Sequence, residues 1–302
     1  MAYRHPALEK IDRTVGLFSW EPENTIPADL AAMTSAAERF GFSSLWYPEA
    51  YGREAMTNGA LLVANSTELI IGSAIASIWA RDAVNAKNAA RTLDAWSNQR
   101  YILGLGVSHQ PLVERMRGHN YSKPFAAMNE YLDAMANAKM TSPEGQLEPP
   151  VLIAALGPKM LELAAEKADG ALPYLVTPEH TARARSIMGP DAYLVVEQGV
   201  AITDDDEDFR ERCYDYLVMY TGLPNYVNNL KTLGFDDEDF IRGGSTKLQD
   251  GLVPRGAEAI AESVNAHFEA GANHVILSVL PHRERGFDVS EWEQLSHLTG
   301  KR

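Results

Sequence analysis

The stretch LIIGSAIASIWARDAVNAKNAARTLDAWSNQRYILGLGVSH, residues 69–109, decides the fold because it contains a complete strand–helix–strand unit. Residues 69–79 and 101–107 are rich in branched apolar side chains, which is typical of buried strands. The segment between them, residues 82–99, predicts a helix with Asp82 as its N-cap. Two strands joined through a helix in this way run parallel, with a right-handed crossover.

The same unit recurs along the chain. Strands are predicted over residues 15–20, 43–50, 69–79, 101–107, 151–156, 170–176, 192–202 and 274–281. Helices are predicted over residues 27–40, 59–66, 82–99, 124–140, 158–168, 178–188, 254–270 and 291–298. These repeated β-α units predict one α/β domain, residues 1–302, folded as a closed (β/α)8 TIM barrel. An open doubly wound sheet stays an alternative, because a single miscounted strand would change the architecture.

Two segments depart from this repeat. SPEGQLEPP, residues 142–150, is a Pro-rich linker that is short enough to be a loop inside one domain. Residues 204–250 are polar and largely helical, with loop-like interruptions. We interpret residues 204–250 as a variable helical lid region inserted after strand seven.

The composition excludes several classes of function. The chain has 41 acidic and 27 basic residues and a net charge of −14, whereas binding to nucleic acid or an anionic membrane needs clustered Lys and Arg. The single cysteine, Cys213, is typical of a reducing cytoplasm. No apolar signal core or membrane-spanning segment is visible. The histidines lack metal-binding spacing, so no metal centre is expected. We predict a soluble, cytoplasmic protein with a small-molecule partner.

The end of the strand at residues 101–107 carries the first candidate site. Its GLGVSH lacks the third glycine of a dinucleotide-binding fingerprint, and Gln110 replaces the second glycine of a nucleophile elbow. As barrel strand four, it would place Val107, Ser108 and His109 at its C-terminal end, where TIM-barrel active sites form. A histidine there suits proton transfer near neutral pH. Alternatively, Ser108 and His109 only cap the strand end by hydrogen bonding.

The second candidate site is the turn LGPKM, residues 156–160. The helix that starts at Pro158 offers free N–H groups and a positive dipole end to an anion, although a plain β-α turn is the alternative. Ala154 and Ala155 leave space for a bulky ligand, and the small residues of GSAIAS, residues 72–77, leave a slot for a planar ring or serve tight helix packing. Further polar groups are expected at the same face: Glu49, Tyr51 and Tyr174. Together these features predict a site for a phosphorylated planar cofactor.

Two segments resemble the luciferase-like monooxygenase superfamily. Residues 69–109 are similar to the pattern LGTAV…R-P…A…LD…S-GR-LGLGVG of its members, and PPVLIAALGPKMLELAAEKADGALPYLVTPEH, residues 149–180, is similar to their cofactor segment. The likeness covers roughly residues 12–200 and the last strand, and it weakens over residues 204–250. Within the superfamily, the chain looks most like the actinobacterial branch assigned to coenzyme F-420, an 8-hydroxy-5-deazaflavin.

The resemblance implies a TIM barrel with the cofactor ring against strand three, where a non-prolyl cis peptide bond falls at Ala74–Ile75. It maps the cofactor contacts of the family onto Pro48, Glu49, Ala74, Ile75, Ala76, Val107, Ser108, His109, Ala154, Ala155, Leu156, Gly157 and Tyr174. In the sugar-phosphate dehydrogenase branch, a Glu stands at the position of His109, and an Asp-His or Glu-His pair at the position of Glu49-Ala50. These departures count against a sugar-phosphate substrate and leave the proton-transfer residue open.

The resemblance further implies an oxidoreductase that transfers a hydride between coenzyme F-420 and a small organic substrate, with the protein acting as a homodimer. His109 is the best-placed catalytic acid/base, and Glu49 is the second candidate. An FMN-dependent monooxygenase and a non-catalytic flavin-binding barrel stay open as alternative functions. The lid tyrosines either roof the substrate pocket or face the core of a long helix: Tyr214, Tyr216, Tyr220 and Tyr226.

Overall fold

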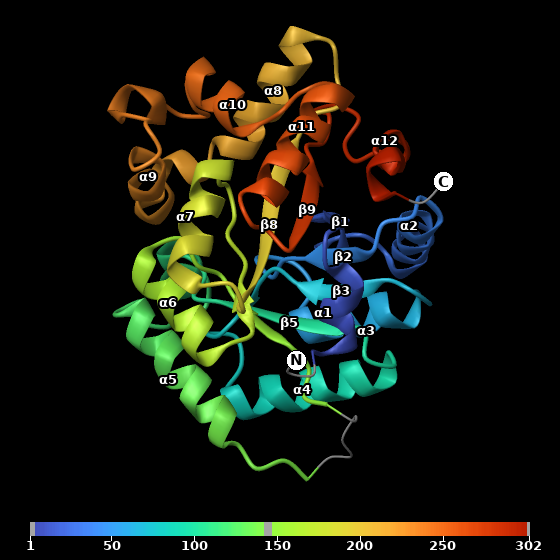
Figure 1. Ribbon diagram of the computed structural model, residues 1–302, viewed down its shortest axis with the longest axis vertical. Coiled ribbons are helices and arrows are strands. Elements are labelled where there is room, and N and C mark those ends of the chain that lie inside the picture. Colours follow the sequence, from blue (N-terminus) through green and yellow to red (C-terminus); the bar gives the residue numbers. More distant parts are fainter. Residues whose placement is uncertain (1–3, 142–146, 301–302) are drawn as a thin grey trace.

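Parallel strand pairing closes the barrel. The computed structural model describes residues 4–141 and 147–300, so residues 142–146 of the expected Pro-rich linker lie outside the described part. The strands are β1 (Thr14–Phe18), β2 (Ser44–Tyr47), β3 (Ile70–Ser73), β4 (Ala76–Ser77), β5 (Tyr101–Gly106), β6 (Val151–Ile153), β7 (Gly170–Ala171), β8 (Tyr193–Val200) and β9 (His274–Val279). All their pairings are parallel, and β1 pairs with both β2 and β9. The pairing of β3 with β5 completes the ring (Figure 1). The TIM barrel is therefore confirmed, and the open sheet is wrong.

The third barrel strand is interrupted. The expected strand at residues 69–79 consists of β3 and β4, separated by the peptide bond Ala74–Ile75, which is cis as the resemblance implies. Both halves pair with β5, through Ile71 and Gly72 in β3 and through Ala76 and Ser77 in β4. The interruption therefore lies within the barrel wall, toward the C-terminal ends of the strands.

Helices follow the strands and cover the outside of the barrel (Figure 1). They are α2 (Pro27–Arg39), α3 (Ala55–Ala64), α4 (Ala83–Trp96), α5 (Pro124–Asn137), α6 (Pro158–Lys167), α7 (Pro178–Met188), α11 (Gly256–Glu269) and α12 (Val289–Gln294). As predicted, Asp82 caps α4 by accepting a hydrogen bond from the N–H of Asn85 at 2.9 Å. The helix predicted from Gly59 begins earlier, because the Glu54 carboxylate caps the N–H groups of Met56 and Thr57.

Apolar side chains fill the interior of the barrel. A short helix that the sequence analysis did not predict, α1 (Pro6–Ile11), closes the N-terminal end of the barrel with its buried side chains. The interior cluster consists of Ala7, Leu8, Ile11, Phe18, Trp46, Ile70, Ile102, Leu152, Leu172, Tyr193, Val195 and Ile276. The N-terminal end and the interior of the barrel are therefore packed with side chains. A site can form only at the C-terminal ends of the strands.

Residues 204–250 form three helices, α8 (Asp206–Leu217), α9 (Pro224–Lys231) and α10 (Thr246–Leu252), with the 3-10 turns η3 (Tyr220–Gly222) and η4 (Asp237–Phe240). These helices lie together at one end of the molecule, in the upper part of Figure 1. They share an apolar cluster of their own, which includes Cys213, Leu217 and Leu248. Within the described residues, no helix has the length and apolarity that crossing a bilayer requires.

Gly104 of β5 gives a test of this packing. A Cβ at Gly104 would overlap the backbone oxygen of Ser73 in the neighbouring strand, which cannot move without breaking the ladder. We expect Gly104→Ala to lower the free energy of unfolding by about 1–3 kcal/mol, the usual cost of overpacking. Gly222→Ala is the matched control, since a Cβ at Gly222 meets no atom within 4 Å. Denaturant unfolding measures both variants, and equal stabilities would contradict the expected overlap.

Candidate active site

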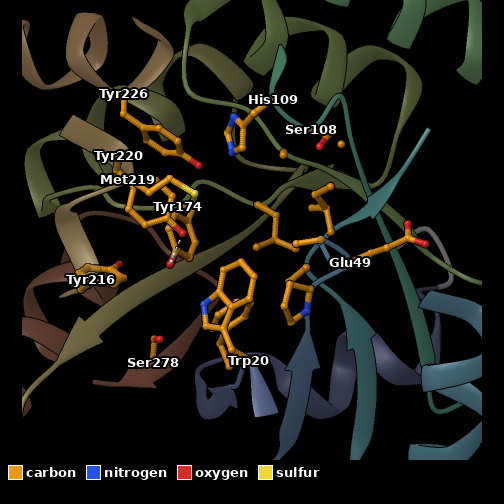
Figure 2. A pocket seen from close by; sticks show the side chains of 18 of the residues that line it. Trp20, Glu49, Ser108, His109, Tyr174, Tyr216, Met219, Tyr220, Tyr226 and Ser278 are labelled. Atoms are coloured by element: carbon orange, nitrogen blue, oxygen red, sulfur yellow. Dashed lines mark hydrogen bonds between the residues drawn. The ribbon is translucent and has the colours of Figure 1, made fainter. Parts of the chain in front are cut away.

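A large cavity opens at the C-terminal ends of the strands, beneath the helices of residues 204–250. Its volume is about 1210 Å³. Residues that follow β1, β2, β3, β5, β6, β7 and β9 line its floor and walls, and residues of α8, η3 and α9 line its roof (Figure 2). Active sites of TIM barrels form at this face of the fold. The cavity is therefore the candidate active site.

All but one of the residues predicted to bind the cofactor line this cavity. They are Pro48, Glu49, Ala74, Ile75, Val107, Ser108, His109, Ala154, Ala155, Leu156, Gly157 and Tyr174. Tyr51 also lines it. The exception is Ala76, which is fully buried in the core between the barrel and its helices. Successive residues of a strand face opposite sides, so Ala76 faces away from the cavity that Ile75 lines.

The backbone after β5 is held in a fixed shape. Ser108 has a left-handed φ of 56°, and its carbonyl accepts a hydrogen bond from the Tyr121 hydroxyl at 3.1 Å. The Trp79 indole donates to the carbonyl of Val107 at 2.8 Å. These bonds satisfy backbone groups of the turn, and the turn carries the side chain of His109 into the cavity (Figure 2).

His109 is half-buried, and its ring lies 5.7 Å from the Tyr226 ring, measured between centroids. None of the hydrogen bonds found among the described residues engages its ring nitrogens. Burial lowers the pKa of His109 from its ordinary value of 6.5, because the charged form loses solvation. The imidazole is thus neutral at pH 7 and has a nitrogen lone pair available for proton transfer.

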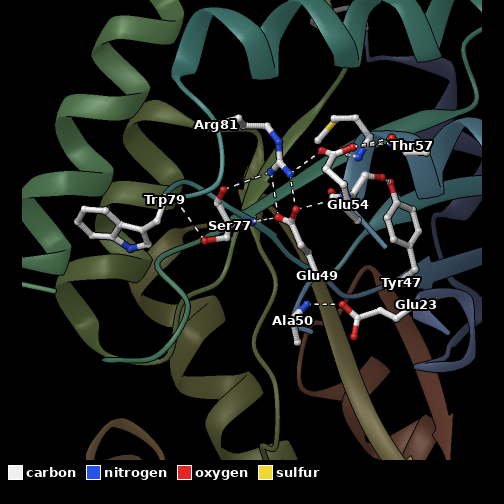
Figure 3. Close-up of polar contacts among 12 residues, drawn as sticks. Glu23, Tyr47, Glu49, Ala50, Glu54, Thr57, Ser77, Trp79 and Arg81 are labelled. Carbon is white, nitrogen blue, oxygen red and sulfur yellow. Dashed lines mark hydrogen bonds and ion pairs between the residues drawn. The ribbon is translucent and has the colours of Figure 1, made fainter. Parts of the chain in front are cut away.

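The carboxylate of Glu49, the second candidate acid/base, is fully occupied by hydrogen bonds within the protein. Arg81 binds both of its carboxylate oxygens, and the backbone N–H groups of Ser77 and Ala55 donate to them at 2.8 and 3.2 Å (Figure 3). Both charged groups are buried, and Arg81 also pairs with Glu54 at 2.6 Å. The carboxylate points away from the middle of the cavity (Figure 2). Glu49 therefore ties the end of β2 to β4 and α3, and its carboxylate is not free for proton transfer.

The turn before α6 combines small residues with open space. Ala154 and Ala155 follow β6, and a Cβ added at Gly157 would meet no atom within 4 Å. His180 of α7 donates from Nε2 to the carbonyl of Leu156 at 2.9 Å, and burial lowers the pKa of His180 to about 4. The turn is therefore fixed by a neutral histidine and leaves room beside the N-terminus of α6.

Tyrosines form the roof of the cavity. Tyr216, Tyr220 and Tyr226 line it, as does Tyr174 from the loop after β7. The Tyr220 hydroxyl donates to that of Tyr174 at 3.1 Å, and the rings of Tyr220 and Tyr226 pack edge-to-face at 4.9 Å. Tyr214 does not take part, because its ring lies against Arg283 outside this group. Three of the tyrosines of residues 204–250 therefore line the cavity, as the roof interpretation expects, and Tyr214 does not.

One acidic residue beside the roof escaped the sequence analysis. Glu197 lies in β8, fully buried, and its carboxyl oxygens are 3.1 and 3.2 Å from the hydroxyl of Tyr216. Burial raises the pKa of Glu197 to about 8, so its carboxyl is largely protonated at pH 7. A single acidic residue within the apolar run AYLVVEQGVAI, residues 192–202, was the available signal.

A family model described as "Luciferase-like monooxygenase" matches residues 17–273. The chain is 31% identical over 199 residues to a protein of Mycobacterium tuberculosis named as a coenzyme F-420-dependent oxidoreductase, covering 56% of each chain. It is 28% identical over 170 residues to a 5,10-methylenetetrahydromethanopterin reductase of Methanolobus tindarius, covering 49% of this chain and 51% of that one. The matches thus span about half the length of these relatives.

Solved structures share the fold. A coenzyme F-420-dependent tetrahydromethanopterin reductase from Methanopyrus kandleri superposes with a TM-score of 0.75 at 17% identity, covering 95% of this chain and 98% of that one. An F-420-dependent secondary alcohol dehydrogenase superposes with a TM-score of 0.74 at 14% identity, covering 94% of this chain and 97% of that one. The oxygenating part of a Pseudomonas putida diketocamphane monooxygenase was solved with FMN. It superposes with a TM-score of 0.69 at 14% identity, covering 96% of this chain and 97% of that one. At these identities the likeness concerns the fold alone.

Arg81 gives a test of the cavity wall. We expect Arg81→Met to lower the free energy of unfolding by about 3–5 kcal/mol, since Glu49 would be left as a buried, unpaired charge. Lys10→Met is the control: it breaks the exposed Lys10–Glu68 pair and changes the stability by less than about 1 kcal/mol. Denaturant unfolding at pH 7 measures both. Equal losses of unfolding free energy in the two variants would show that Arg81 does not stabilise the buried charge of Glu49.

His109 gives a second test, by proton NMR. We expect its ring to titrate with a midpoint below 6.5, because burial disfavours the imidazolium. The resonance is assigned as the one that His109→Gln removes. A midpoint at or above 6.5 would mean that the ring is solvated or paired with an anion, and that it is not a neutral base at pH 7.

Proposed function

The chain belongs to the luciferase-like monooxygenase family, and on that basis we propose that it is an oxidoreductase that transfers a hydride between coenzyme F-420 and a small organic substrate. The observation that carries the proposal is the cavity of about 1210 Å³, which joins a floor of small residues to the neutral imidazole of His109. The name of the relative from Mycobacterium, an F-420-dependent oxidoreductase, supports the choice of a deazaflavin. The name of the relative from Methanolobus, a reductase, supports hydride transfer to a substrate.

The residues of the cavity fit a planar, phosphate-bearing cofactor. Pro48, Ile75, Ala154 and Ala155, which line the cavity, would hold its ring. The N-terminus of α6 beside Gly157 would hold a phosphate, because no side chain caps this end of the helix and the space there is open. When bound, a deazaflavin donates or accepts a hydride at its C5.

The chain itself supplies position, shielding and proton transfer. The Glu49–Arg81 pair fixes the ends of β2 and β4 at the cavity wall. The roof tyrosines cover the substrate side and exclude water. His109, neutral at pH 7, has a free ring nitrogen in the cavity and is the candidate base for a substrate hydroxyl or amine that is oxidised.

An FMN-dependent monooxygenase is the second candidate function. The diketocamphane monooxygenase solved with FMN has nearly the same fold, and a flavin ring has the same planar outline as a deazaflavin ring. The two candidate functions use different cofactors in the same cavity. Measuring the affinities of the protein for FMN and for coenzyme F-420 therefore distinguishes them.

We also propose a homodimer in the cytoplasm. The family resemblance supports the dimer, and the free, buried Cys213 fits a reducing compartment. Analytical ultracentrifugation of the purified chain measures the oligomeric state.

Ala154 at the cavity floor provides the test. We expect Ala154→Leu to weaken the binding of coenzyme F-420 by about tenfold to a hundredfold, since overfilling a packed site costs about 1–3 kcal/mol. Ala28→Leu, on the exposed face of α2, leaves the affinity unchanged. Cofactor fluorescence during titration with the apoprotein measures the binding.

FMN is titrated in parallel with coenzyme F-420. Tight binding of FMN without affinity for F-420 would overturn the proposal in favour of the monooxygenase. Binding of F-420 without any substrate-dependent absorbance change would favour a non-catalytic flavin-binding barrel.

A further inference from the structure

At the roof of the cavity, the hydroxyl of Tyr216 lies between the cavity and the buried carboxyl group of Glu197. Glu197 is fully buried and points into the barrel from β8, with its oxygens 3.1 and 3.2 Å from the Tyr216 hydroxyl. The backbone N–H of Leu175 donates to the same carboxyl at 3.2 Å. Tyr216 is half-buried and lines the cavity (Figure 2). The only polar side chain that joins Glu197 to the cavity, among the described residues, is therefore Tyr216.

The ring of Tyr216 packs against Gly199, two residues after Glu197 in β8. A Cβ at Gly199 would lie 2.9 Å from Cε1 of Tyr216 and 3.0 Å from its Cζ and Oη. Real Cβ atoms do not approach other atoms so closely, so any larger residue would displace the ring. Gly199 thus seats Tyr216 against the strand that carries Glu197.

The surroundings keep Glu197 uncharged. The ionisable groups that face it are Tyr174 after β7, Tyr216 of α8, Tyr220 of η3 and Tyr226 of α9. Its partner in the register with β9 is Ile276, and no Lys, Arg or His among the described residues forms an ion pair with it. Burial without a cation explains why its pKa is raised to about 8.

We propose that Tyr216 is a catalytic proton donor to the substrate and that Glu197 is the positioning residue that directs the Tyr216 proton into the cavity and then replaces it. This inference rests on the proposed hydride-transfer function. It specifies the substrate as a carbonyl or imine compound, whose oxygen or nitrogen takes a proton when its carbon is reduced.

The direction of one hydrogen bond decides whether the proton is available. In the structure the Tyr216 hydroxyl is placed to donate to the oxygens of Glu197. When Glu197 is neutral, its O–H can donate to the oxygen of Tyr216 instead, and the hydrogen of Tyr216 is then free to point into the cavity. An ionised Glu197 can only accept, and it turns that hydrogen away from the cavity. Burial also raises the pKa of Tyr216, so the phenol releases its proton only when another is supplied at once. The carboxyl proton of Glu197 meets this need.

The cavity then has a base on one side, His109, and an acid, Glu197, behind Tyr216 on the other. Burial lowers the pKa of His109 and raises that of Glu197, so at pH 7 the first is an unprotonated base and the second a protonated acid. Environments that push two pKa values apart in this way assign the acid and base roles.

The step balances with a reduced deazaflavin as the hydride source. The substrate carbon receives the hydride, and the π electrons of its C=O or C=N bond move to the heteroatom. The heteroatom takes the proton of Tyr216, and the resulting phenolate takes the proton of Glu197. After the product leaves, Tyr216 passes its proton to Glu197 and takes a new proton from water in the cavity.

Infrared spectroscopy of the apoprotein tests the pairing without any cofactor. We expect a protonated-carboxyl band that disappears with a midpoint near pH 8 and that Glu197→Gln removes. Tyr216→Phe shifts this band, because the carboxyl loses its partner. Tyr214→Phe, which removes a hydroxyl from the same helix outside the roof, leaves it unmoved. A missing band, or one that Tyr216→Phe does not shift, overturns the proposal.

Turnover of the loaded enzyme tests the proton donation, with cyclohexanone, benzaldehyde and 1-pyrroline as probes and reduced coenzyme F-420 as donor. We expect Tyr216→Phe to lower kcat by about a hundredfold, a typical contribution of a general acid, with the Kd for F-420 changed less than twofold. Tyr214→Phe keeps kcat. Full kcat in Tyr216→Phe, or no reduction of any probe by an enzyme that binds F-420, overturns the proposal.

The pH profile separates positioning from a purely structural role. Wild-type kcat falls as the pH rises through about 8, when Glu197 ionises. In Glu197→Gln the amide still donates to Tyr216 but carries no transferable proton, so we expect kcat about tenfold lower and no fall near pH 8. A wild-type profile in this variant overturns the role of Glu197. Failure of F-420 to bind would instead overturn the proposed function, and the infrared result would still decide whether Glu197 and Tyr216 are coupled.

Discussion

Each strand of the barrel pairs in parallel with its neighbours, and the ring closes where β5 pairs with both halves of the interrupted third strand. Because all strands run the same way, every turn that follows a strand meets at one rim. That rim brings together Pro48, Ala74, His109, Ala154 and Tyr174, although the sequence separates them by many residues. Toward the other end, buried apolar side chains of the strands and of α1 fill the interior. The position of the cavity is thus a consequence of strand direction.

Burial gives the charged groups around this cavity different roles. Glu49 is buried against a cation, Arg81, and stays engaged as an anchor of the wall. Glu197 is buried without a cation, and the loss of solvation raises its pKa to about 8. His109 loses solvation too, which lowers its pKa and leaves a neutral ring. Two carboxyl groups near one rim therefore have different partners, a cation for Glu49 and a phenol for Glu197.

Most of the fold was predictable from short-range patterns. Apolar runs, the cap at Asp82 and the prolines that start helices such as α2 and α6 are local signals, and the structure has these elements where the sequence indicates them. The errors also have local causes. The start of α3 was placed too late because a Glu cap is a weaker signal than Ser or Asp, and α1 has only six residues, too few to show a helical period.

By itself, the sequence determined the barrel and its rim, because strand order and strand ends follow from the chain. The family resemblance then added residues such as Pro48, Ala74 and Ile75 to the set expected near the cavity. Only the tertiary structure decided what each side chain does there. The partner of Glu49 lies 32 positions away at Arg81, and that of Glu197 lies 19 positions away at Tyr216. The inward or outward direction of Ala76 depends on the register of β4. Such pairings arise from packing and desolvation across the ring, and no local pattern of residues encodes them.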